Sequence, residues 1–369
     1  MAELNTIPDL EFFREILSID STSGNEQPLL DLLREKMAGT CPAMTQSTDG
    51  KHWLLLQYGT PEVVFCTHID TVPPYIPPTF IGADGQPCEP QDAVEVRGRG
   101  ACDAKGQILA MLTACRQLAS EGASDFGLLL LTGEETGSWG AKAFAKTGFR
   151  APYLIIGEPT ENKMVSASKG TKSYQLTFRG EAFHSGYPQY GRSAVDAFVE
   201  FCNALKAADF GIDPILGETT WNIGQLHSDN PQNILSPELT CRLYFRTTFV
   251  SDQAVQDWMS SAPRQWPELS LRRSEPGSCH SRACPWNLSV EAIGGDSPAE
   301  YLTLPGFENA PVAFGSDAPH LSNFDHKIIC GPGSIRFAHR DDEHILVRDL
   351  ETAAGQYVRM YHALHNQGK

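Results

Sequence analysis

Short apolar runs, several of them followed at once by a histidine or an acidic residue, most constrain how this 369-residue chain can fold. Between the runs, residues 105–119 carry apolar side chains at helical spacing, which predicts an amphipathic helix. Strands buried on both faces that alternate with helices are typical of an α/β sheet covered by helices on both sides. We therefore expect an α/β fold with a mixed sheet. The runs cover residues 53–57, 63–66, 127–131 and 153–156.

The pattern of apolar and polar residues changes between about residues 164 and 273. Residues 173–179 and 239–249 alternate like half-exposed strands, and residues 193–208 between them have a helical pattern. This order predicts a small α+β domain inserted into a larger one, with residues 276–285 as the returning linker. The expected division is 1–163 for the first part of the catalytic domain, 164–275 for the insert and 276–369 for the second part.

Charge and cysteine content exclude several classes of protein. The formal net charge is −16, which argues against a nucleic-acid or anionic-membrane partner. No basic leader with an apolar stretch begins the chain, so we expect a cytoplasmic protein without a signal peptide. None of the ten cysteines forms a C-x-x-C pair, so we expect buried or unreactive free thiols rather than disulfides. Cys279 and Cys284 flank His280, but their spacing is not that of a zinc finger.

Chemically active side chains follow the ends of the predicted strands. In an open α/β sheet, ligands bind beyond the carboxyl ends of the strands, so such side chains meet at one edge. Five separate segments therefore direct histidines or carboxylates toward the same edge. These residues are His68, Asp70, Asp103, Glu134, Glu135, Glu158, His339 and Glu343.

Two imidazoles and several carboxylates in one place need positive charge, because packed like charges are costly. A pair of divalent metal ions supplies that charge. Nitrogen and oxygen ligands without a thiolate suit zinc, and also cobalt or manganese. One carboxylate must stay free as a general base, and the adjacent Glu134 and Glu135 allow this if the chain turns at Gly133.

Each of these motifs taken singly has an ordinary structural interpretation. A His-x-Asp pair is usually structural, and a Glu-Glu pair is most often a solvated surface. Their joint placement after buried strands is what favours a site. Other functions lack their motifs: Gly98 and Gly100 have no third glycine for a dinucleotide-binding turn, and the chain has neither a phosphate-binding loop nor a serine-hydrolase elbow.

Six motifs together resemble the dinuclear zinc deacylases and exopeptidases. That family includes acetylornithine deacetylase, succinyl-diaminopimelate desuccinylase, aminoacylase and glutamate carboxypeptidase, and the texture is nearest to the acetylornithine deacetylase-like members. The resemblance covers nearly the whole chain and implies a zinc-exopeptidase fold whose insert is a lid and the interface of a homodimer. In chain order the motifs are T-H-I-D-T-V, G-R-G-A-C-D-A-K-G, T-G-E-E-T-G, G-E-P-T, F-H-S-G-Y-P and A-H-R-D-D-E.

The resemblance also implies a role for each residue of the metal site. Two divalent metal ions, zinc or else cobalt or manganese, would share Asp103 as a bridge. Asp70 would orient one histidine, and Glu134 would be the general base that takes a proton from the attacking water and passes it to the departing amine. The implied ligands are His68, Asp103 and Glu158 for the first metal, with Glu135 and His339 for the second.

Five further residues match positions of the family that contact the substrate or line its pocket. His184 resembles the histidine that reaches another subunit's active site and steadies the oxyanion; its alternative is an ordinary surface histidine. Arg246 matches an arginine that grips the substrate's carboxylate, and the alternative is a surface arginine. Asn233 lies in a lid motif whose proline comes one place late here. Ser316 and Asp317 match a loop that lines the pocket.

The expected function is metal-dependent hydrolysis of the amide bond of an N-acyl-L-amino acid. N-acetyl-L-ornithine, a substrate of arginine biosynthesis, is favoured because the chain is compact and resembles the biosynthetic deacetylases. A metallo-dipeptidase or carboxypeptidase with the same metal site is the alternative. A single-domain aminopeptidase would lack the insert. A non-catalytic scaffold would normally have lost a ligand or the base, and this chain keeps all of them.

Overall fold

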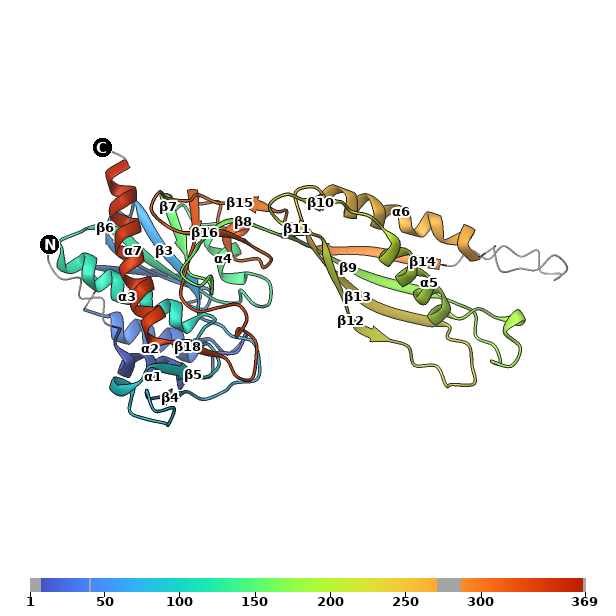
Figure 1. Ribbon diagram of the computed structural model, residues 1–369, viewed down its shortest axis with the longest axis horizontal. Helices are drawn as coiled ribbons and strands as arrows, with labels where there is room; N and C mark the ends of the chain where they lie inside the picture. Colours follow the sequence, from blue (N-terminus) through green and yellow to red (C-terminus); the bar gives the residue numbers. More distant parts are fainter. Residues whose placement is uncertain (1–7, 40, 271–286, 368–369) are drawn as a thin grey trace. The chain divides into compact units, whose positions relative to one another are not determined.

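The computed structural model describes residues 8–39, 41–270 and 287–367 and divides the chain into two compact units (Figure 1). The first unit contains Met1–Ser166, Tyr301–Ala310 and Ser316–Lys369. The second contains Ala167–Glu300 and Pro311–Gly315, so it is inserted into the first. We expected the return at residue 276, but the strand β14 (Asn287–Gly294) pairs with β9 (Gly170–Arg179) and extends the second unit to Glu300.

The first unit is built on a six-stranded mixed sheet of order β1-β2-β6-β3-β7-β17. β6, β3, β7 and β17 run parallel, whereas β1 and β2 are antiparallel at one side. The expected α/β fold with a mixed sheet is confirmed. The strands are β1 (Ala43–Gln46), β2 (Trp53–Gly59), β3 (Val63–His68), β6 (Asp125–Leu131), β7 (Ala151–Ile156) and β17 (Phe324–Ile329).

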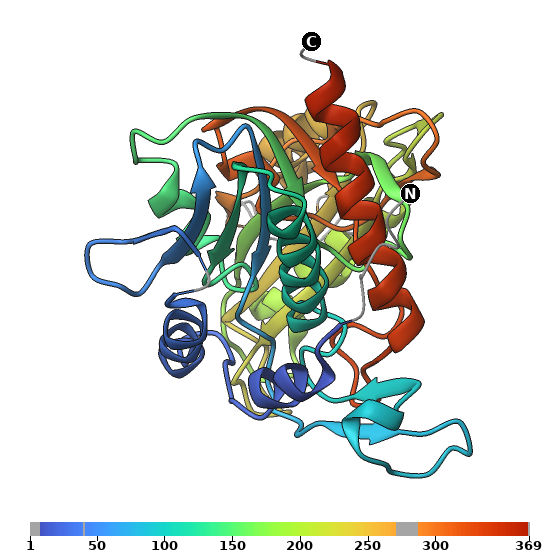
Figure 2. The ribbon, with the colours of Figure 1, turned by 90° about the vertical axis from the view of Figure 1, so that its left-hand side faces the viewer.

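Helices cover both faces of this sheet because its strands are apolar on both sides. Leu128 and Leu130 of β6 join the core under α3 and α7, which pack against each other (Figure 2). The alternate residues of the strands face the other side of the sheet. There the ring of Trp53 in β2 packs edge-on against the ring of Phe144 in α4, with 5.2 Å between the ring centroids. The helices are α1 (Leu10–Leu17), α2 (Gln27–Met37), α3 (Lys105–Ser120), α4 (Trp139–Phe144) and α7 (Val347–Gln367).

Two small sheets accompany the central one. β18 (His344–Leu346), β5 (Glu95–Arg97) and β4 (Thr79–Ile81) form an antiparallel sheet in the first unit. The segments where the chain passes between the units include a sheet of order β15-β8-β16, with β15 (Ala299–Glu300), β8 (Met164–Ser168) and β16 (Asn309–Val312). Short 3₁₀ turns lie at η1 (Pro90–Asp92), η2 (Pro188–Tyr190) and η4 (Ala318–His320).

The second unit is an antiparallel sheet of order β12-β13-β9-β14 with two helices packed on it. Alternate residues of β9 and β13 are buried, and they form a core with Phe201 and Met259 of the helices. The small α+β domain predicted from the alternating pattern is therefore present. Its remaining elements are α5 (Ala194–Ala207), β10 (Ile212–Asp213), β11 (Gly217–Glu218), β12 (Thr220–His227), β13 (Glu238–Thr247) and α6 (Asp252–Ser270).

The predictions about cysteines and membranes concern the described part of the chain. Its eight cysteines are all free thiols, and five of them are buried. Cys279, His280 and Cys284 lie outside the described residues. Among the helices that the structure describes, none is both long and apolar enough to cross a membrane.

Candidate metal centre

The predicted site residues of the first unit lie beyond the carboxyl ends of its parallel strands. β3 ends at His68, the turn after β6 carries Glu134 and Glu135, and Glu158 follows β7. The chain brings in two more side chains, one just before α3 and one between β17 and β18. Their ligand atoms form overlapping groups in which all atoms lie within 4.8 Å of one another. These groups are His68, Asp103 and Glu158; His68, Glu134 and Glu135; and Asp103, Glu135 and His339.

Asp103 joins two of these groups. Its Oδ1 lies 3.0 Å from Nε2 of His68, and its Oδ2 lies 3.4 Å from Nε2 of His339. The same nitrogen of His339 lies 2.9 Å from Oε1 of Glu135. A carboxylate that turns one oxygen toward each of two histidines has the arrangement of a bridge between two metal ions.

His68 is oriented by the residue two places further along the chain. Its Nδ1 lies 2.9 Å from the carbonyl oxygen of Asp70 and 3.5 Å from the Oδ1 of that residue. Because a carbonyl oxygen only accepts hydrogen bonds, Nδ1 is the donor. A neutral His68 therefore presents the lone pair of Nε2 toward the cluster, as a metal ligand must.

Asp70 also holds the turn that carries the two glutamates. The main-chain N–H groups of Glu134 and Glu135 donate to Oδ1 and Oδ2 of Asp70 at 3.0 and 3.2 Å. The hydroxyl of Ser23 donates to Oδ2 at 2.8 Å. Asp70 is fully buried, so it connects β3 with the turn after β6 at fixed geometry. No sequence motif pointed to this contribution from Ser23.

The turn itself depends on Gly133. Its φ is +67°, and a Cβ at this position would lie 2.5 Å from Cδ1 of Trp139. Only glycine fits there without strain. The predicted turn at Gly133 is present, and it lets Glu134 and Glu135 both reach the group that contains His68.

Burial dominates the protonation of the carboxylates. It raises the pKa of Glu158 well above its ordinary value, and the charge of Glu134 raises it further. Burial also raises the pKa of Glu134 well above its ordinary value; the charge of His68 opposes this rise, and the negative charges of Asp317 and Glu135 add to it. In the metal-free protein these two glutamates therefore bind protons more tightly than free carboxylates do.

The histidines are held in their charged form. Burial opposes this at His68, but hydrogen bonds with Asp103 and Asp70 raise its pKa well above the ordinary value. Hydrogen bonds with Asp103 and Glu135 raise the pKa of His339 to about 10. Burial raises the pKa of Asp103, yet its hydrogen bonds with both histidines outweigh burial and leave its pKa below the ordinary value.

This donor set fits divalent cations. Protons on His68, His339, Glu134 and Glu158 supply the positive charge that the buried carboxylates need, and metal ions would replace those protons. The groups contain imidazole nitrogens and carboxylate oxygens, which suit zinc, cobalt or manganese. Cobalt and manganese stay alternatives to zinc.

Asp317 is a member of this neighbourhood that the sequence identified only as part of a loop lining the pocket. It is buried, its carboxylate accepts a hydrogen bond from Ser138, and burial raises its pKa to about 6. Its Oδ1 has no hydrogen-bond partner within the described residues. Its position directly after Ser316 in the G-S-D-A motif was the available signal. The Ser316 hydroxyl itself accepts from the N–H of Ala318 at 3.3 Å.

Glu343 lies elsewhere than expected. The sequence directed it toward the same edge as the ligands, but it belongs to none of the metal-binding groups. It is 1% exposed, and main-chain N–H groups of the loop before α3 surround its carboxylate. The carboxylate of Glu343 therefore binds the main chain of this loop and is not part of the candidate metal site.

The other predicted site residues belong to the second unit. His184 and Asn233 lie on neighbouring segments: Ser185 donates its N–H to the carbonyl of Asn233 at 2.9 Å. His184 is exposed, and its Nδ1 accepts the N–H of Gly186 at 3.0 Å. Arg246 lies on β13 with its guanidinium 5.1 Å from the ring of Tyr244. These residues are exposed or half-buried, which suits contact with a ligand.

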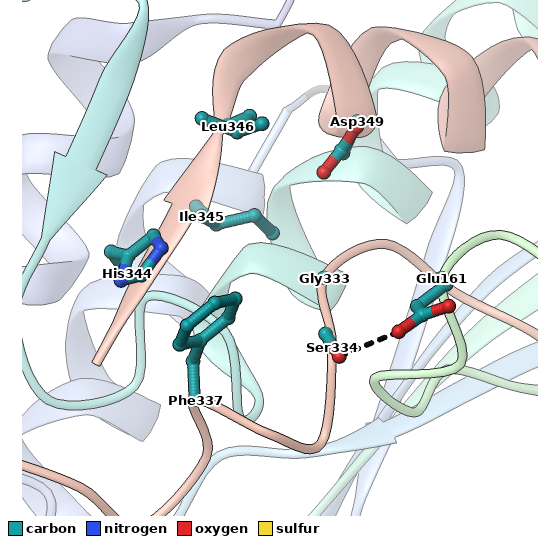
Figure 3. A pocket seen from close by; sticks show the side chains of 8 residues that line it. All are labelled: Glu161, Gly333, Ser334, Phe337, His344, Ile345, Leu346 and Asp349. Carbon is teal, nitrogen blue, oxygen red and sulfur yellow. Dashed lines mark hydrogen bonds between the residues drawn. The ribbon is translucent and has the colours of Figure 1, made fainter. Parts of the chain in front are cut away.

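A small cavity of about 140 Å³ lies beside the segment that carries His339 (Figure 3). Its lining includes the apolar side chains of Phe337 and Ile345, and also Ser334, whose hydroxyl donates to Glu161 (Figure 3). None of the residues of the metal-binding groups lines it. The cavity is therefore separate from the candidate metal centre.

A mixed α/β unit with a histidine–carboxylate cluster beyond its parallel strands, interrupted by a small α+β unit, is the architecture of a zinc exopeptidase. The chain belongs to peptidase family M20/M25/M40, whose model matches residues 64–363. This places it in the family of dinuclear zinc exopeptidases and deacylases that the sequence motifs resemble.

Curated relatives and solved structures agree with this membership. A probable carboxypeptidase of Aspergillus oryzae is 30% identical over 98% of this chain and 88% of its own length. A tripeptidase of Staphylococcus aureus has a TM-score of 0.74 at 18% identity, covering 96% of this chain and 98% of its own. An M20 family metallo-carboxypeptidase of Sulfolobus solfataricus has a TM-score of 0.69 at 15% identity, covering 97% and 98%. At these identities the two structures establish the fold alone.

The protein is thus a metallohydrolase that acts on amide bonds. Two divalent metal ions, typically zinc, are the cofactors of this family, and the predicted metal dependence is confirmed. The scaffold alternative is not supported, since the family and its named relatives are hydrolases.

Proposed function

We propose that this protein is a metallo-carboxypeptidase or dipeptidase that hydrolyses short peptides at a two-metal site. The histidine–carboxylate cluster around Asp103 carries the metal-dependent part of the proposal, because its residues would supply ligands for two ions and leave Glu134 free as a base. The curated relative named as a carboxypeptidase supports peptides over N-acyl amino acids. Deacetylation of N-acetyl-L-ornithine in arginine biosynthesis was favoured from the sequence and has no specific support from the relatives.

Asp103 is the shared ligand of the two metal ions in this proposal. Its two oxygens already face separate histidines, at 3.0 and 3.4 Å. His68 and Glu158 would complete the first metal position with Asp103, and Glu135 and His339 would complete the second. When bound, the ions supply electrostatic activation of the substrate carbonyl and of a water molecule.

Glu134 is the general base. It lies in the same group as His68, and its main chain is fixed by the buried Asp70. In its charged form Glu134 takes a proton from the attacking water and later gives it to the leaving amine, so that the amide bond breaks with a net transfer of one proton. The partial burial of the turn keeps bulk water from competing for that proton.

The second unit is the lid and the dimer interface in this proposal. His184 of a partner subunit stabilises the oxyanion that forms on the carbonyl oxygen. Arg246 binds the carboxylate at the end of the substrate, for which a guanidinium is well suited. Asn233 and Ser316 contribute further substrate contacts. A homodimer and a cytoplasmic location complete the proposal.

A substrate panel tests this function. The panel contains dipeptides, tripeptides, the same peptides with an amidated C-terminus, N-acetyl-L-ornithine and N-succinyl amino acids, each with zinc and with a chelator. We expect zinc-dependent release of the C-terminal residue only from peptides with a free carboxylate. Turnover of N-acetyl-L-ornithine alone would contradict this proposal and support the deacetylase instead. Release of the N-terminal residue from amidated peptides would indicate an aminopeptidase.

A further inference from the structure

A buried carboxylate outside the metal-binding groups holds the loop that carries Asp103. The Oε1 atom of Glu343 accepts hydrogen bonds from the main-chain N–H groups of Gly100, Cys102 and Asp103, at 3.0, 3.0 and 3.1 Å. Three N–H groups that converge on one oxygen form an anion-binding nest. The carboxylate is thus enclosed by the main chain of this loop.

The small sheet of β18 and β5 places this carboxylate. His344 pairs with Arg97, so Glu343 lies beside Gly98, whose N–H donates to the carbonyl of Glu343 at 3.0 Å. The chain then needs φ of +139° at Gly98 and +84° at Gly100 to turn around the side chain. These glycines allow the main-chain N–H groups to point inward.

Arg99 neutralises the buried charge. Its Nη1 lies 2.6 Å from Oε2 of Glu343, and both side chains are almost completely buried. The same guanidinium donates to the carbonyls of Pro74 and Arg340 at 3.2 and 3.1 Å. All the described contacts of this ion pair are inside the protein, so it does not depend on a ligand.

The contacts of Glu343 connect two ligand-bearing segments that are distant in the sequence. One segment contains Asp103, whose main-chain N–H donates to the carboxylate of Glu343. The other segment contains Glu343 itself, four residues after His339. His339 faces Oδ2 of Asp103, so the separation of these two ligands follows from where Glu343 anchors the loop.

We propose that Glu343 is a positioning residue for the dinuclear centre, fixing Asp103 from behind and anchoring the segment of His339 so that both metal positions keep their geometry. The inference rests on the ligand positions assigned under the proposed function. It predicts that Glu343 determines metal affinity without contacting metal or substrate.

The contacts require a carboxylate of this length. A glutamine offers one acceptor oxygen and an NH₂ group, so it satisfies either the three N–H groups or Arg99 but not both. Aspartate is one methylene shorter and cannot reach the nest and the guanidinium together. Glu343→Gln leaves Arg99 buried without its counter-charge, so the double variant Arg99→Met with Glu343→Gln removes that cost as well.

Zinc titration of the metal-free protein tests the proposal. Competition with a chromophoric chelator measures the affinity and stoichiometry, and the visible absorption of the cobalt-loaded protein reports the ligand geometry. We expect two zinc ions per wild-type chain, and affinities roughly 10–100-fold weaker with an altered cobalt spectrum in both variants. The matched control Asp252→Asn breaks the Lys172–Asp252 ion pair of 2.7 Å in the second unit and keeps wild-type affinity.

Two other results would overturn parts of this account, and they are distinguishable. If either folded variant keeps wild-type zinc affinity and an unchanged cobalt spectrum, Glu343 only braces the fold. If the wild-type chain itself fails to bind two zinc ions, the ligand assignment of the proposed function is wrong. Should Glu343→Gln fail to fold, the double variant decides, because it contains no unpaired buried charge.

Discussion

At the scale of single residues, the centre is organised by side chains that each serve two partners. Asp103 divides its oxygens between two histidines, and the carboxylate of Asp70 lies 3.5 Å from Nδ1 of His68 while it accepts hydrogen bonds from main-chain N–H groups of the turn of the glutamates. Side chains with two fixed partners lose less freedom when a ligand arrives, because their orientation is already determined. Changes at these residues should therefore disturb the geometry of the centre.

Replacing Glu134 with glutamine should abolish turnover while metal remains bound. The variant keeps the shape of the side chain but cannot accept the proton of the attacking water, so kcat should fall by roughly 10²–10⁴-fold or more. Steady-state kinetics and the metal content of the purified protein measure the two effects. Glu351→Gln, an exposed change on α7, is the control and should be silent. A near-normal rate in Glu134→Gln would contradict the assignment of the base.

The stability of the metal-free protein should fall as pH rises from about 6.5 to about 10. His339 has an ordinary pKa of 6.5 and a folded pKa of about 10, so its stabilising contribution is complete below the first value and lost through the second. Glu134 and Glu158 act in the same direction, since their pKa values are raised in the folded state. Thermal unfolding in a chelator measures this slope, and His339→Gln should flatten it. A melting temperature that rises over this range would contradict the prediction.

At the scale of elements, the site depends on turns that follow strands rather than on the strands themselves. The apolar runs predicted β2, β3, β6 and β7 because strands buried on both faces are apolar throughout. Edge strand β12 was missed because none of its residues is fully buried, and the alternation of Trp221 and Ile223 ends at a register shift between Gly224 and His227. The contacts of Glu343 with Asp103 and of Ser23 with Asp70 could not be predicted from the sequence either, since these pairs are 240 and 47 positions apart.

Gly133→Ala tests the turn after β6. The new Cβ would meet Trp139 at 2.5 Å in a conformation with φ of +67°, so we expect a loss of about 1–3 kcal/mol of stability. Because the turn carries both glutamates, kcat should fall as well. Gly148→Ala is the matched control, since a Cβ there meets nothing within 4 Å. Chemical denaturation and kinetics on both variants separate the effects; equal behaviour of the two would show that the turn tolerates a side chain.

At the scale of the whole molecule, the described residues form two separate hydrophobic cores. One joins α3 and α7 to the central sheet, and the other joins α5 and α6 to the sheet of the second unit. The change in hydrophobic pattern near residue 164 led us to expect an insertion from that point, because a half-exposed antiparallel sheet alternates and a buried parallel sheet does not; the second unit begins at Ala167. The expected end was too early because β14 contributes a strand to the insert after the segment that looked like a linker.

Two cores predict two unfolding transitions, of which zinc should shift only one. All groups of the candidate metal centre lie in the first unit, so saturating zinc at 100 times its Kd should stabilise that unit by about 2.7 kcal/mol.

Phe201→Ala removes a fully buried ring from the core of the second unit and should lower the stability of that unit by about 3–5 kcal/mol. Differential scanning calorimetry of both proteins, with zinc and with a chelator, measures the two shifts. Leu33→Ala in the core of the first unit is the control and should lower the zinc-sensitive transition. A single transition that moves with both zinc and Phe201→Ala would show instead that the units unfold as one cooperative body, with metal binding stabilising the second unit as well as the first.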